Sequence, residues 1–501
     1  MTSAALDPPS ILVLDSTTTG DRDLLGGKAW SIQRMMALGI PVPPAFVITT
    51  DLCRRMRATG EALPADVWRD VPAAVAELEA STARRFAATS RPLLVSVRSG
   101  AATSMPGMMD TILNLGMTDE VEQALAEQSG DPTFAADTRR RFDQQFEKVV
   151  GCLPPTDPWE QLRRAMVAVL DSWNSPRAIS YRESRGLPHD AGTAVTVQAM
   201  VFGNLDDRSG TGVLFTRNPL TGGAEAYGEW LPRGQGEDVV SGRADALALA
   251  DLAATMPTVH SDLLAAAAQL ETDSRDVQDI EFTVESGTLW LLQARVAKRS
   301  PEAAIRHAVV LRQEGLITAT EALDRVRPAH VRYLLAPHLD QADVDITAPV
   351  ATGKPACPGI ATGTVVIDAV DAEQRADQGE AVILARPTTD PDDVAAMSVA
   401  AAVITELGGS TSHAAVVCRE LAIPCVVGCG TGTLMALAGR KVTVDAATGV
   451  VYPGEFTIVP ATTVEDPDIA LLTQWACAES PYGAPGSLPE LLQRRKMEKI
   501  R

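Results

Sequence analysis

The chain has little that would carry it into a membrane or onto a nucleic acid. No apolar run reaches the roughly 18 residues that a membrane-spanning helix needs, and the first seven residues lack the basic and apolar character of a leader. The formal net charge of −20 argues against a nucleic-acid-binding surface, because phosphate backbones require clustered Lys and Arg. We therefore expect a cytoplasmic protein that binds neither membranes nor nucleic acids.

Disulfides and aromatic residues are also scarce. The seven cysteines, an odd number scattered over 501 residues, form no disulfide framework. Cys418, Cys425 and Cys429 are close in sequence, but no second CxxC and no paired histidine supports a zinc site. Aromatics make up only 4% of the chain, and hydrophobic residues make up 46%. Length and composition together predict a soluble protein of about three domains or subdomains.

The most informative segment, 408–415, reads GGSTSHAA and follows an apolar run that predicts a short buried strand. The Ala, Val and Leu content of residues 413–421 favours a helix, so His413 stands at a strand-to-helix turn. Thr411 or Ser412 can cap this helix, and its free N–H groups and dipole favour negative charge at the histidine. Such a turn suits a phosphorylated imidazole, although spacing alone more often indicates a packed or capping histidine.

Two segments nearer the N-terminus combine glycine with a cation. Gly26-Gly27-Lys28 opens an amphipathic helix that ends at Gly39, and its lysine can reach a phosphate or lie in solvent. The spacing is not that of a GxxxxGK phosphate-binding loop. An apolar strand at 93–97 delivers Arg98 to a turn. The loop 101–111 that follows has small, hydroxyl and methionine residues and can lay N–H groups over a polyphosphate.

A β-rich region near the middle of the chain ends in a hairpin that turns at 285–287. Because side chains at i and i+2 share a strand face, Asp279 and Glu281 project together, and so do Gln293 and Arg295. A carboxylate pair on one face can hold Mg²⁺ when substrate phosphates supply further oxygens. Simple solvent exposure of the hairpin is the alternative interpretation.

Several motifs together resemble the pyruvate, phosphate dikinases of the phosphoenolpyruvate-utilising enzyme family. GGxTSHAA resembles the phosphohistidine motif of their swivelling domain, as do PGIATG at 358–363 and IPCVVG at 423–428. The segments that resemble their ATP-grasp domain are GGK, VSVRSGAxxSMPGMMDT at 95–111, VQxMVFGN at 197–204, GVLFTRNPxTG at 212–222, GQGEDVVSG at 234–242 and QDIEFT…GTLWLLQAR at 278–295. Two positions depart from the family: Ser410 replaces a usual methionine, and Ala29 a frequent glycine.

The resemblance implies an α/β (α+β) protein in which an ATP-grasp nucleotide-binding domain precedes a swivelling β/α phosphohistidine domain. The expected boundaries are 1–344 for the ATP-grasp domain with a helical insert at about 115–190, 345–358 for a linker, 359–455 for the phosphohistidine domain and 456–501 for a C-terminal tail. Full-length dikinases continue into a barrel of about 250 residues that binds pyruvate or phosphoenolpyruvate. Because fewer than about 50 residues follow Gly454, we expect the resemblance to cover only the first two of the family's three domains.

The resemblance also implies residue roles. His413 would be the catalytic nucleophile, and the loop 100–111 would be a phosphate lid. The residues implied to contact ATP or its Mg²⁺ are Lys28, Arg98 and Arg295 at the phosphates, Glu281 and Gln293, with Asp279 nearby, at the metal and phosphate oxygens, Gln198 and Met200 near the adenine, and Glu237 near the ribose. Fixed cations and metal-binding carboxylates suit the charge that develops during phosphoryl transfer.

The implied reaction begins when His413 attacks the β-phosphorus of ATP and AMP leaves. Inorganic phosphate then removes the terminal phosphoryl group as pyrophosphate, and the remaining phosphohistidine is transferred to pyruvate, giving phosphoenolpyruvate. A separate barrel-domain protein and a homodimer are open alternatives for further partners. Thr411 stands where plant dikinases are regulated by phosphorylation.

Three interpretations compete. The first is a dikinase, or a homologue limited to the half-reaction with ATP, phosphate and histidine. The second is a phosphotransferase for another acceptor, such as the antibiotic-inactivating relatives. The third is a non-catalytic nucleotide-binding regulatory module, which the retention of so many site residues disfavours.

Overall fold

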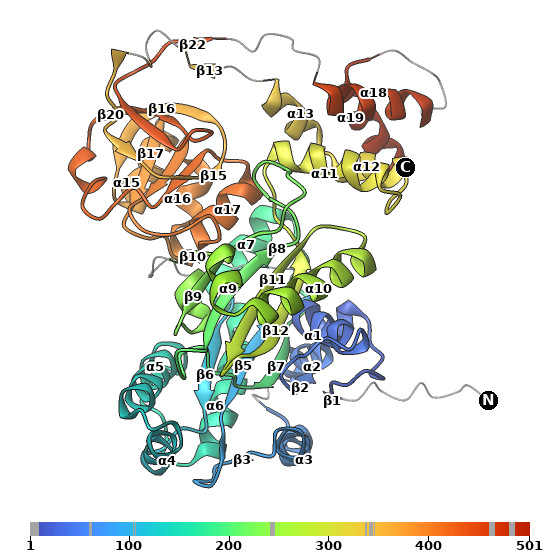
Figure 1. Cartoon of the computed structure of the whole chain (residues 1–501), viewed down its shortest axis with the longest axis vertical. Helices are drawn as coiled ribbons and strands as arrows, with labels where there is room; N and C mark the ends of the chain where they lie inside the picture. Colours follow the sequence, from blue (N-terminus) through green and yellow to red (C-terminus); the bar gives the residue numbers. More distant parts are fainter. Residues whose placement is uncertain are drawn as a thin grey trace. The chain divides into compact units, whose positions relative to one another are not determined.

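A computed structural model describes residues 10–59, 63–103, 105, 107–240, 246–335, 338–339, 344, 346–459, 466–479 and 486–500 (Figure 1). The chain divides into two compact units. The first contains Met1–Gly210 and Phe282–Ala294, and the second contains Thr211–Glu281 and Arg295–Arg501. These units differ from the boundaries expected from the sequence, so the functional domain boundaries stay a prediction.

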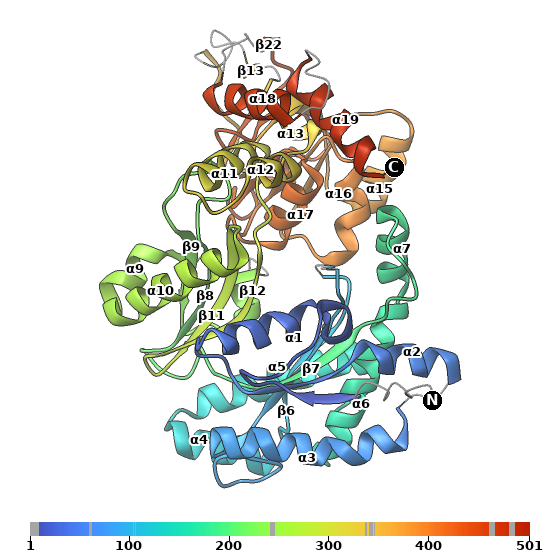
Figure 2. The ribbon, with the colours of Figure 1, turned by 90° about the vertical axis from the view of Figure 1, so that its right-hand side faces the viewer.

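An antiparallel five-stranded sheet forms the centre of the first unit, in the order β1-β2-β7-β5-β6. The strands, in that order, are Ile11–Val13, Ala45–Ile48, Ala194–Ala199, Val95–Gly100 and Thr111–Leu115. Every residue of β2 and β7 is buried, and so is every residue of β5 except Arg98. Strands buried on both faces need helices on both sides, and Figure 2 shows α1 and α3 on opposite sides of this sheet.

The described part of the first unit contains seven helices, and most of them fall where the sequence predicted helical structure. They are α1 (Arg22–Ala37), α2 (Thr50–Thr59), α3 (Ala65–Thr82), α4 (Asp119–Ser129), α5 (Pro132–Val150), α6 (Pro158–Asp171) and α7 (Pro176–Arg185). The last four begin at side-chain caps, whose oxygens accept hydrogen bonds from first-turn N–H groups. Local signals therefore set most of these boundaries. The parallel pair β3 (Arg85–Phe86) and β4 (Pro92–Leu93) lies outside the main sheet.

A second five-stranded sheet has the order β10-β9-β8-β11-β12. Its strands are Leu247–Ala248, Tyr227–Pro232, Gly210–Phe215, Gln278–Glu285 and Thr288–Val296. The helices next to it in sequence are α8 (Gly236–Val240), α9 (Leu249–Thr255) and α10 (Pro257–Ser274). The last two strands form the predicted hairpin, with Ser286 and Gly287 at positive φ in its turn.

A helical cluster in the second unit joins two parts of the chain that are far apart in sequence. Its members are α11 (Pro301–Gln313), α12 (Ala319–Arg325), α13 (Pro328–Leu334), α18 (Pro467–Glu479) and α19 (Leu488–Ile500). Leu311, Val331, Leu472 and Leu491 contribute to its core. The segment expected to be a tail therefore supplies two packed helices, and its residues 460–465, 480–485 and 501 lie outside the described residues.

The eight-stranded sheet of the second unit carries His413. Its order is β14-β21-β20-β16-β17-β18-β19-β15, and β16 to β19 run parallel. In that order the strands are Ala351–Thr352, Val450–Pro453, Lys441–Asp445, Ile360–Val366, Val382–Arg386, Ala402–Thr405, Cys425–Val427 and Lys354–Cys357. Its helices are α15 (Ala369–Asp377), α16 (Val394–Val399) and α17 (His413–Leu421). A separate two-stranded sheet pairs β13 (His338–Leu339) with β22 (Ile458–Val459).

Each face of this sheet has its own core, because alternate residues of a strand point to opposite faces. Val403 belongs to the core that contains helix residues such as Ala415, whereas Ala402 and Ile404 belong to the other core. Residues 351–357 were expected to be linker, but they form β14 and β15 of this sheet. Of that expected linker, residue 345 lies outside the described residues.

Five of the seven free cysteines are buried, and three of them come together where α17 packs on the sheet. Cys357 and Cys425 are opposite each other on β15 and β19, and Cys418 of α17 lies beside Cys425. Burial raises the pKa of the Cys357 thiol to about 12, so it is a poor nucleophile. Cys152 and Cys477 are half-buried. None of the helices in the described ranges is long and apolar enough to cross a membrane.

Candidate functional site

The His413 turn lies at the carboxyl ends of parallel strands. β18 ends at Thr405 and α17 begins at His413, as the sequence predicted. The neighbouring parallel strand β17 ends at Arg386, and the loop after it brings the Thr389 hydroxyl to 3.2 Å from Nδ1 of His413. Ligand sites in parallel α/β sheets characteristically form at such strand ends.

The helix cap differs from the sequence prediction. Ser412 is the N-cap residue of α17, but its hydroxyl makes no capping hydrogen bond. The Thr411 hydroxyl donates instead to Oε2 of Glu229 on β9, at 2.6 Å. The expected side-chain cap was therefore wrong for both residues. Thr411 has a carboxylate partner instead, and the buried Ser412 hydroxyl has no hydrogen-bond partner among the described residues.

Burial keeps the His413 imidazole neutral. It lowers the pKa of His413 below the usual value of 6.5, and it outweighs the opposite effect of Asp390 and Asp393. Nδ1 has Thr389 as its partner, whereas Nε2 has no hydrogen-bond partner within the described ranges. The structure thus presents one oriented nitrogen and one nitrogen whose bonding capacity is unused.

Ionic contacts fix the loop that carries Thr389. Arg386 forms an ion pair with Asp393 at 3.1 Å and donates to the Ile367 carbonyl at 3.0 Å. Asp390 and Asp393 form a reciprocal capping box around a short 3₁₀ turn. Sequence reasoning missed Thr389, although a hydroxyl residue shortly after a predicted parallel strand was an available signal.

In the first unit, the Gly26-Gly27-Lys28 turn packs against the end of β5. Gly26 has a φ of 73°, and a Cβ there would clash with the Gly100 carbonyl. Gly27 N–H donates to the Ala101 carbonyl at 2.9 Å. A Cβ at Gly100 would lie 3.2 Å from Cβ of Lys28. The structure therefore brings Lys28 to the strand end that follows Arg98.

The end of β12 joins the same region of the first unit. The Ser31 hydroxyl donates to the Ala294 carbonyl at 2.6 Å, and Ala294 N–H donates back to it at 2.9 Å. Ser31 is one helical turn after Lys28 on α1, and Gln293 precedes Ala294 on β12. Lys28 and Gln293 are thus carried by elements that hydrogen-bond to each other.

The two residues expected near the adenine have internal hydrogen bonds. The buried Gln198 amide donates to the Pro43 carbonyl at 3.1 Å, so this side chain joins β7 to the segment before β2. Met200 is half-buried; its N–H donates to Leu94 at 2.9 Å and its carbonyl accepts from Arg84 at 3.4 Å. The adenine role of both residues stays a prediction. Glu237 lies on α8, and its side chain is outside what the structure describes.

In the second unit, Asp279 forms an ion pair with Arg295. Nε of Arg295 lies 2.8 Å from Oδ2 of Asp279, and the carboxylate is only 2% exposed. The negative charges of Asp279, Glu281 and Glu420 oppose the effect of burial and raise the pKa of Arg295. Both carboxylates of β11, Asp279 and Glu281, therefore act on the Arg295 guanidinium.

A magnesium ion at this cluster would need most of its ligands from outside the protein. Oδ1 of Asp279 is buried and has no hydrogen-bond partner in the part of the chain that the structure describes. Over those same residues, no group of three His, Cys, Asp or Glu side chains is arranged to hold a metal. A Mg²⁺ ion here would need oxygens from a ligand such as a polyphosphate, which is how Mg²⁺ usually binds in nucleotide sites.

The loop expected to be a phosphate lid packs through its methionines. Met105 and Met108 are buried, and Asp110 forms an ion pair with Arg177 of α7. Arg177 also donates to the Met108 carbonyl at 3.3 Å. Ser104 and Pro106 lie outside the described residues. The lid role stays a prediction.

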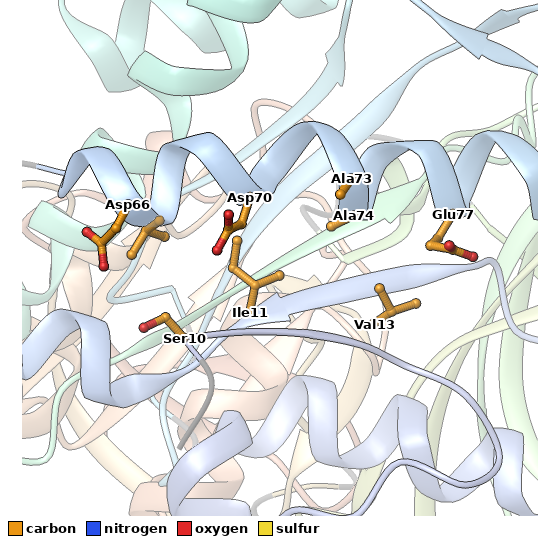
Figure 3. A pocket seen from close by; sticks show the side chains of 9 residues that line it. Ser10, Ile11, Val13, Asp66, Asp70, Ala73, Ala74 and Glu77 are labelled. Atoms are coloured by element: carbon orange, nitrogen blue, oxygen red, sulfur yellow. The ribbon is translucent and has the colours of Figure 1, made fainter. Parts of the chain in front are cut away.

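A separate hollow lies between α3 and β1. Figure 3 shows Asp66, Asp70 and Glu77 of the helix facing Ile11 and Val13 of the strand. None of the residues that line it belongs to the predicted site. The hollow is therefore distinct from the groups described above.

Two segments of the chain match known protein families. Residues 59–246 match the family described as "Pyruvate phosphate dikinase, AMP/ATP-binding domain", and residues 378–449 match "PEP-utilising enzyme, mobile domain". Pyruvate, phosphate dikinase of Rhizobium meliloti (strain 1021) is 39% identical over 91% of this chain and 58% of its own length. Chloroplastic pyruvate, phosphate dikinase 1 of Oryza sativa subsp. japonica is 42% identical over 82% of this chain and 48% of its own. The chain spans about half the length of the curated relatives it matches.

Proposed function

The chain carries the AMP/ATP-binding domain of pyruvate phosphate dikinases and the mobile domain of PEP-utilising enzymes, and from this premise we propose that it phosphorylates His413 at the expense of ATP. The observation that carries the proposal is the state of His413. Its imidazole is kept neutral by burial, with one nitrogen beside Thr389 and the other without a partner among the described residues. A neutral, oriented imidazole is the form that can attack phosphorus.

In the proposed first step, a lone pair of the His413 imidazole forms a bond to the β-phosphorus of ATP. The bond from that phosphorus to the bridging oxygen breaks, and AMP leaves with the electron pair. When the Thr389 hydroxyl accepts from Nδ1–H, the lone pair is on Nε2. That nitrogen is then the attacking atom, and Thr389 fixes the ring orientation.

Charged side chains would stabilise the phosphates. We assign Lys28, Arg98 and Arg295 to phosphate oxygens. Glu281 and Gln293 would hold Mg²⁺, with Asp279 nearby, and the metal would neutralise charge on the transferred group. Asp279 keeps the Arg295 guanidinium in place through the 2.8 Å contact.

The later steps are proposed from the names of the relatives, which act on pyruvate and phosphate. Inorganic phosphate would attack the terminal phosphorus of the pyrophosphorylated histidine and leave as pyrophosphate. The remaining phosphoryl group would pass from His413 to pyruvate, giving phosphoenolpyruvate and free imidazole. Transfer to a different acceptor shares the first step and differs only in this last one.

The test is incubation of the protein with Mg²⁺ and ATP labelled at the β-phosphorus, with and without inorganic phosphate. We expect acid-labile, base-stable label on the protein, release of AMP, and pyrophosphate only when phosphate is added. His413→Asn should take up no label, whereas His260→Asn, which changes a half-buried histidine on α10, should behave as the unmodified protein. Label that persists in His413→Asn, or no label in the unmodified protein, would overturn the proposal.

The acceptor is tested on the isolated, labelled phosphoenzyme. Adding pyruvate together with a separate barrel-domain protein should remove the label from the protein and produce labelled phosphoenolpyruvate, because the pyruvate-binding barrel is expected to be missing from this chain. Label that stays on the protein with both present would reject pyruvate as the acceptor and favour a phosphotransferase with another acceptor.

A further inference from the structure

The turn before His413 receives a carboxylate from a strand about 180 residues away. Glu229 of β9 accepts from Ser410 N–H and from the Ser410 hydroxyl, both at 3.2 Å to Oε1. Its other oxygen accepts from the Thr411 hydroxyl at 2.6 Å. Glu229 is only 8% exposed, so these contacts replace water around a buried charge.

Ser410 has a second partner on the same strand. The Tyr227 hydroxyl donates to Oγ of Ser410 at 2.6 Å, and the Ser410 hydroxyl in turn donates to Glu229. Tyr227 and Glu229 are two residues apart on β9, so both side chains reach the turn from one face of the strand. The Ser410 hydroxyl, which is 1% exposed, therefore acts as acceptor and donor at once.

The backbone of the turn is shaped for this approach. A Cβ at Gly409 would clash with the Glu229 carboxylate, so only glycine permits the close contact. From the other side, Nη1 of Arg419 donates to the Ser410 carbonyl at 2.8 Å and to the Ala356 carbonyl at 3.2 Å. The turn is thus held by Arg419 of its own helix and by Glu229 of β9.

Ser410 departs from the family pattern at the centre of these contacts. The dikinases that this chain resembles usually carry methionine at that position, and a thioether has no O–H to donate to a carboxylate. The serine therefore adds a two-way hydrogen bond that the usual residue would not provide. Nothing in the ATP chemistry itself requires it.

We propose that Ser410 is a positioning residue that latches the histidine-bearing turn onto β9 through Tyr227 and Glu229. The match to a mobile domain gives the latch a purpose, because these contacts must break whenever that domain leaves β9. The latch stabilises the docked arrangement of this chain beyond what a methionine would allow. The role of the latch in domain movement rests on the proposed function, whereas the hydrogen bonds that form it do not.

The test is hydrogen–deuterium exchange of the full chain without ATP, followed over peptides that cover 405–412. The Ser410 amide should exchange slowly, because it donates to a buried carboxylate. Ser410→Val should speed exchange at this turn at least tenfold. Ser410→Thr matches Ser410→Val in side-chain size but keeps the hydroxyl, so its exchange should stay slow. Ser398→Ala, on α16 of the same domain, is the control and should change nothing at 405–412.

The two partners provide a second, gentler measurement. Tyr227→Phe removes only the hydroxyl that donates to Ser410, and Ser410→Ala removes only the serine oxygen. The effects of Tyr227→Phe and Ser410→Ala on exchange should be less than additive in the double variant, because both changes break the same hydrogen bond.

Equal exchange in the Thr and Val variants, or full additivity of Tyr227→Phe with Ser410→Ala, would overturn the latch. Its failure is distinguishable from failure of the proposed function, because no phosphoenzyme is needed for any of these readouts. Slow exchange at the turn with no label from ATP would retain the latch and reject the phosphotransfer.

Discussion

The Thr389 hydroxyl lies 3.2 Å from Nδ1 of His413, and the two residues follow neighbouring parallel strands of one sheet. Within the described residues this contact gives the imidazole a hydrogen-bond partner on Nδ1, and Nε2 has none.

Replacing Thr389 should slow phosphorylation of His413 without unfolding the protein. Thr389→Val keeps the shape of the side chain but removes the hydroxyl, and we expect label uptake from ATP to fall about tenfold, equivalent to about 1.4 kcal/mol. Thr389→Ser keeps the hydroxyl and should stay within about threefold of the unmodified rate. Equal rates for the Val and Ser variants would contradict the orienting role.

The pH dependence of label uptake should reflect the lowered pKa of His413. Because the neutral form is the nucleophile and burial lowers the pKa of His413 below 6.5, uptake should fall to half its maximum only at a pH below 6.5. Asp390 favours the protonated form, so Asp390→Asn should lower the pKa further and move the decline to more acidic pH.

Asp392→Asn is the matched control, since Asp392 is exposed and lies in the same loop. The rates are measured at constant ionic strength between pH 5 and 8. A decline that shifts equally in both variants would mean that Asp390 does not act on His413 through its charge.

Breaking the Asp279–Arg295 pair should impair both stability and magnesium dependence. Asp279→Asn leaves the guanidinium without its buried carboxylate, which we expect to lower the free energy of unfolding by about 3 kcal/mol. It should also raise the Mg²⁺ concentration needed for label uptake. The control is Asp371→Asn, which breaks the exposed pair with Arg375 and should cost at most about 1 kcal/mol in a urea titration. Similar costs for both variants would argue against the buried pair.

Gly26 and Gly39 separate backbone strain from steric clash. Both have positive φ, 73° and 72°, but a Cβ at Gly26 would clash with Gly100 whereas a Cβ at Gly39 would meet nothing within 4 Å. Gly39→Ala should cost about 1 kcal/mol, from the left-handed conformation alone. Gly26→Ala should cost at least about 2 kcal/mol more and weaken ATP binding, because Lys28 would shift. Thermal unfolding and nucleotide titration measure the two effects, and equal costs would contradict the packing of the glycine turn.

His307 should make the protein sensitive to acid. This α11 side chain is fully buried, neither ring nitrogen has a hydrogen-bond partner among the described residues, and burial lowers its pKa to about 3. Between pH 6.5 and about 3 the unfolded chain binds a proton that the folded chain does not, so stability falls as pH falls, by about 1.4 kcal/mol per pH unit.

His307→Leu removes this titration and should flatten the fall in melting temperature between pH 6.5 and 4. His260→Leu, at a half-buried position on α10, should keep the slope of the unmodified protein. An unchanged slope in His307→Leu would show that other groups govern the acid sensitivity.

The sequence predicted those parts of the site that depend on short local patterns of residues. The apolar run and the alanine-rich segment after it placed His413 at a strand-to-helix turn, and the i, i+2 spacing placed Asp279 and Glu281 on one strand face. The glycine pair before Lys28 indicated a special turn, and the positive φ of Gly26 explains it.

The missed features depend on contacts between distant residues. Ser410 meets Tyr227 and Glu229 across more than 180 positions, and no local pattern specifies such a pairing. The hydrogen bond from the Gln198 amide to the Pro43 carbonyl also joins residues distant in sequence, so no local pattern predicts it. Residues 351–357 have few apolar positions and contain proline and glycine, so they gave little strand signal, yet β-sheet neighbours fixed them.

Because most of the cysteines are buried, the reactivity of their thiols reports local opening and unfolding of the protein. In the native state a thiol reagent should meet only Cys152 and Cys477, whereas the unfolded chain offers all seven thiols. Counting modified sulfurs over time therefore reports how often each region opens. Modification of Cys418 would time the opening of the core on the buried side of the histidine helix, with no mutation introduced.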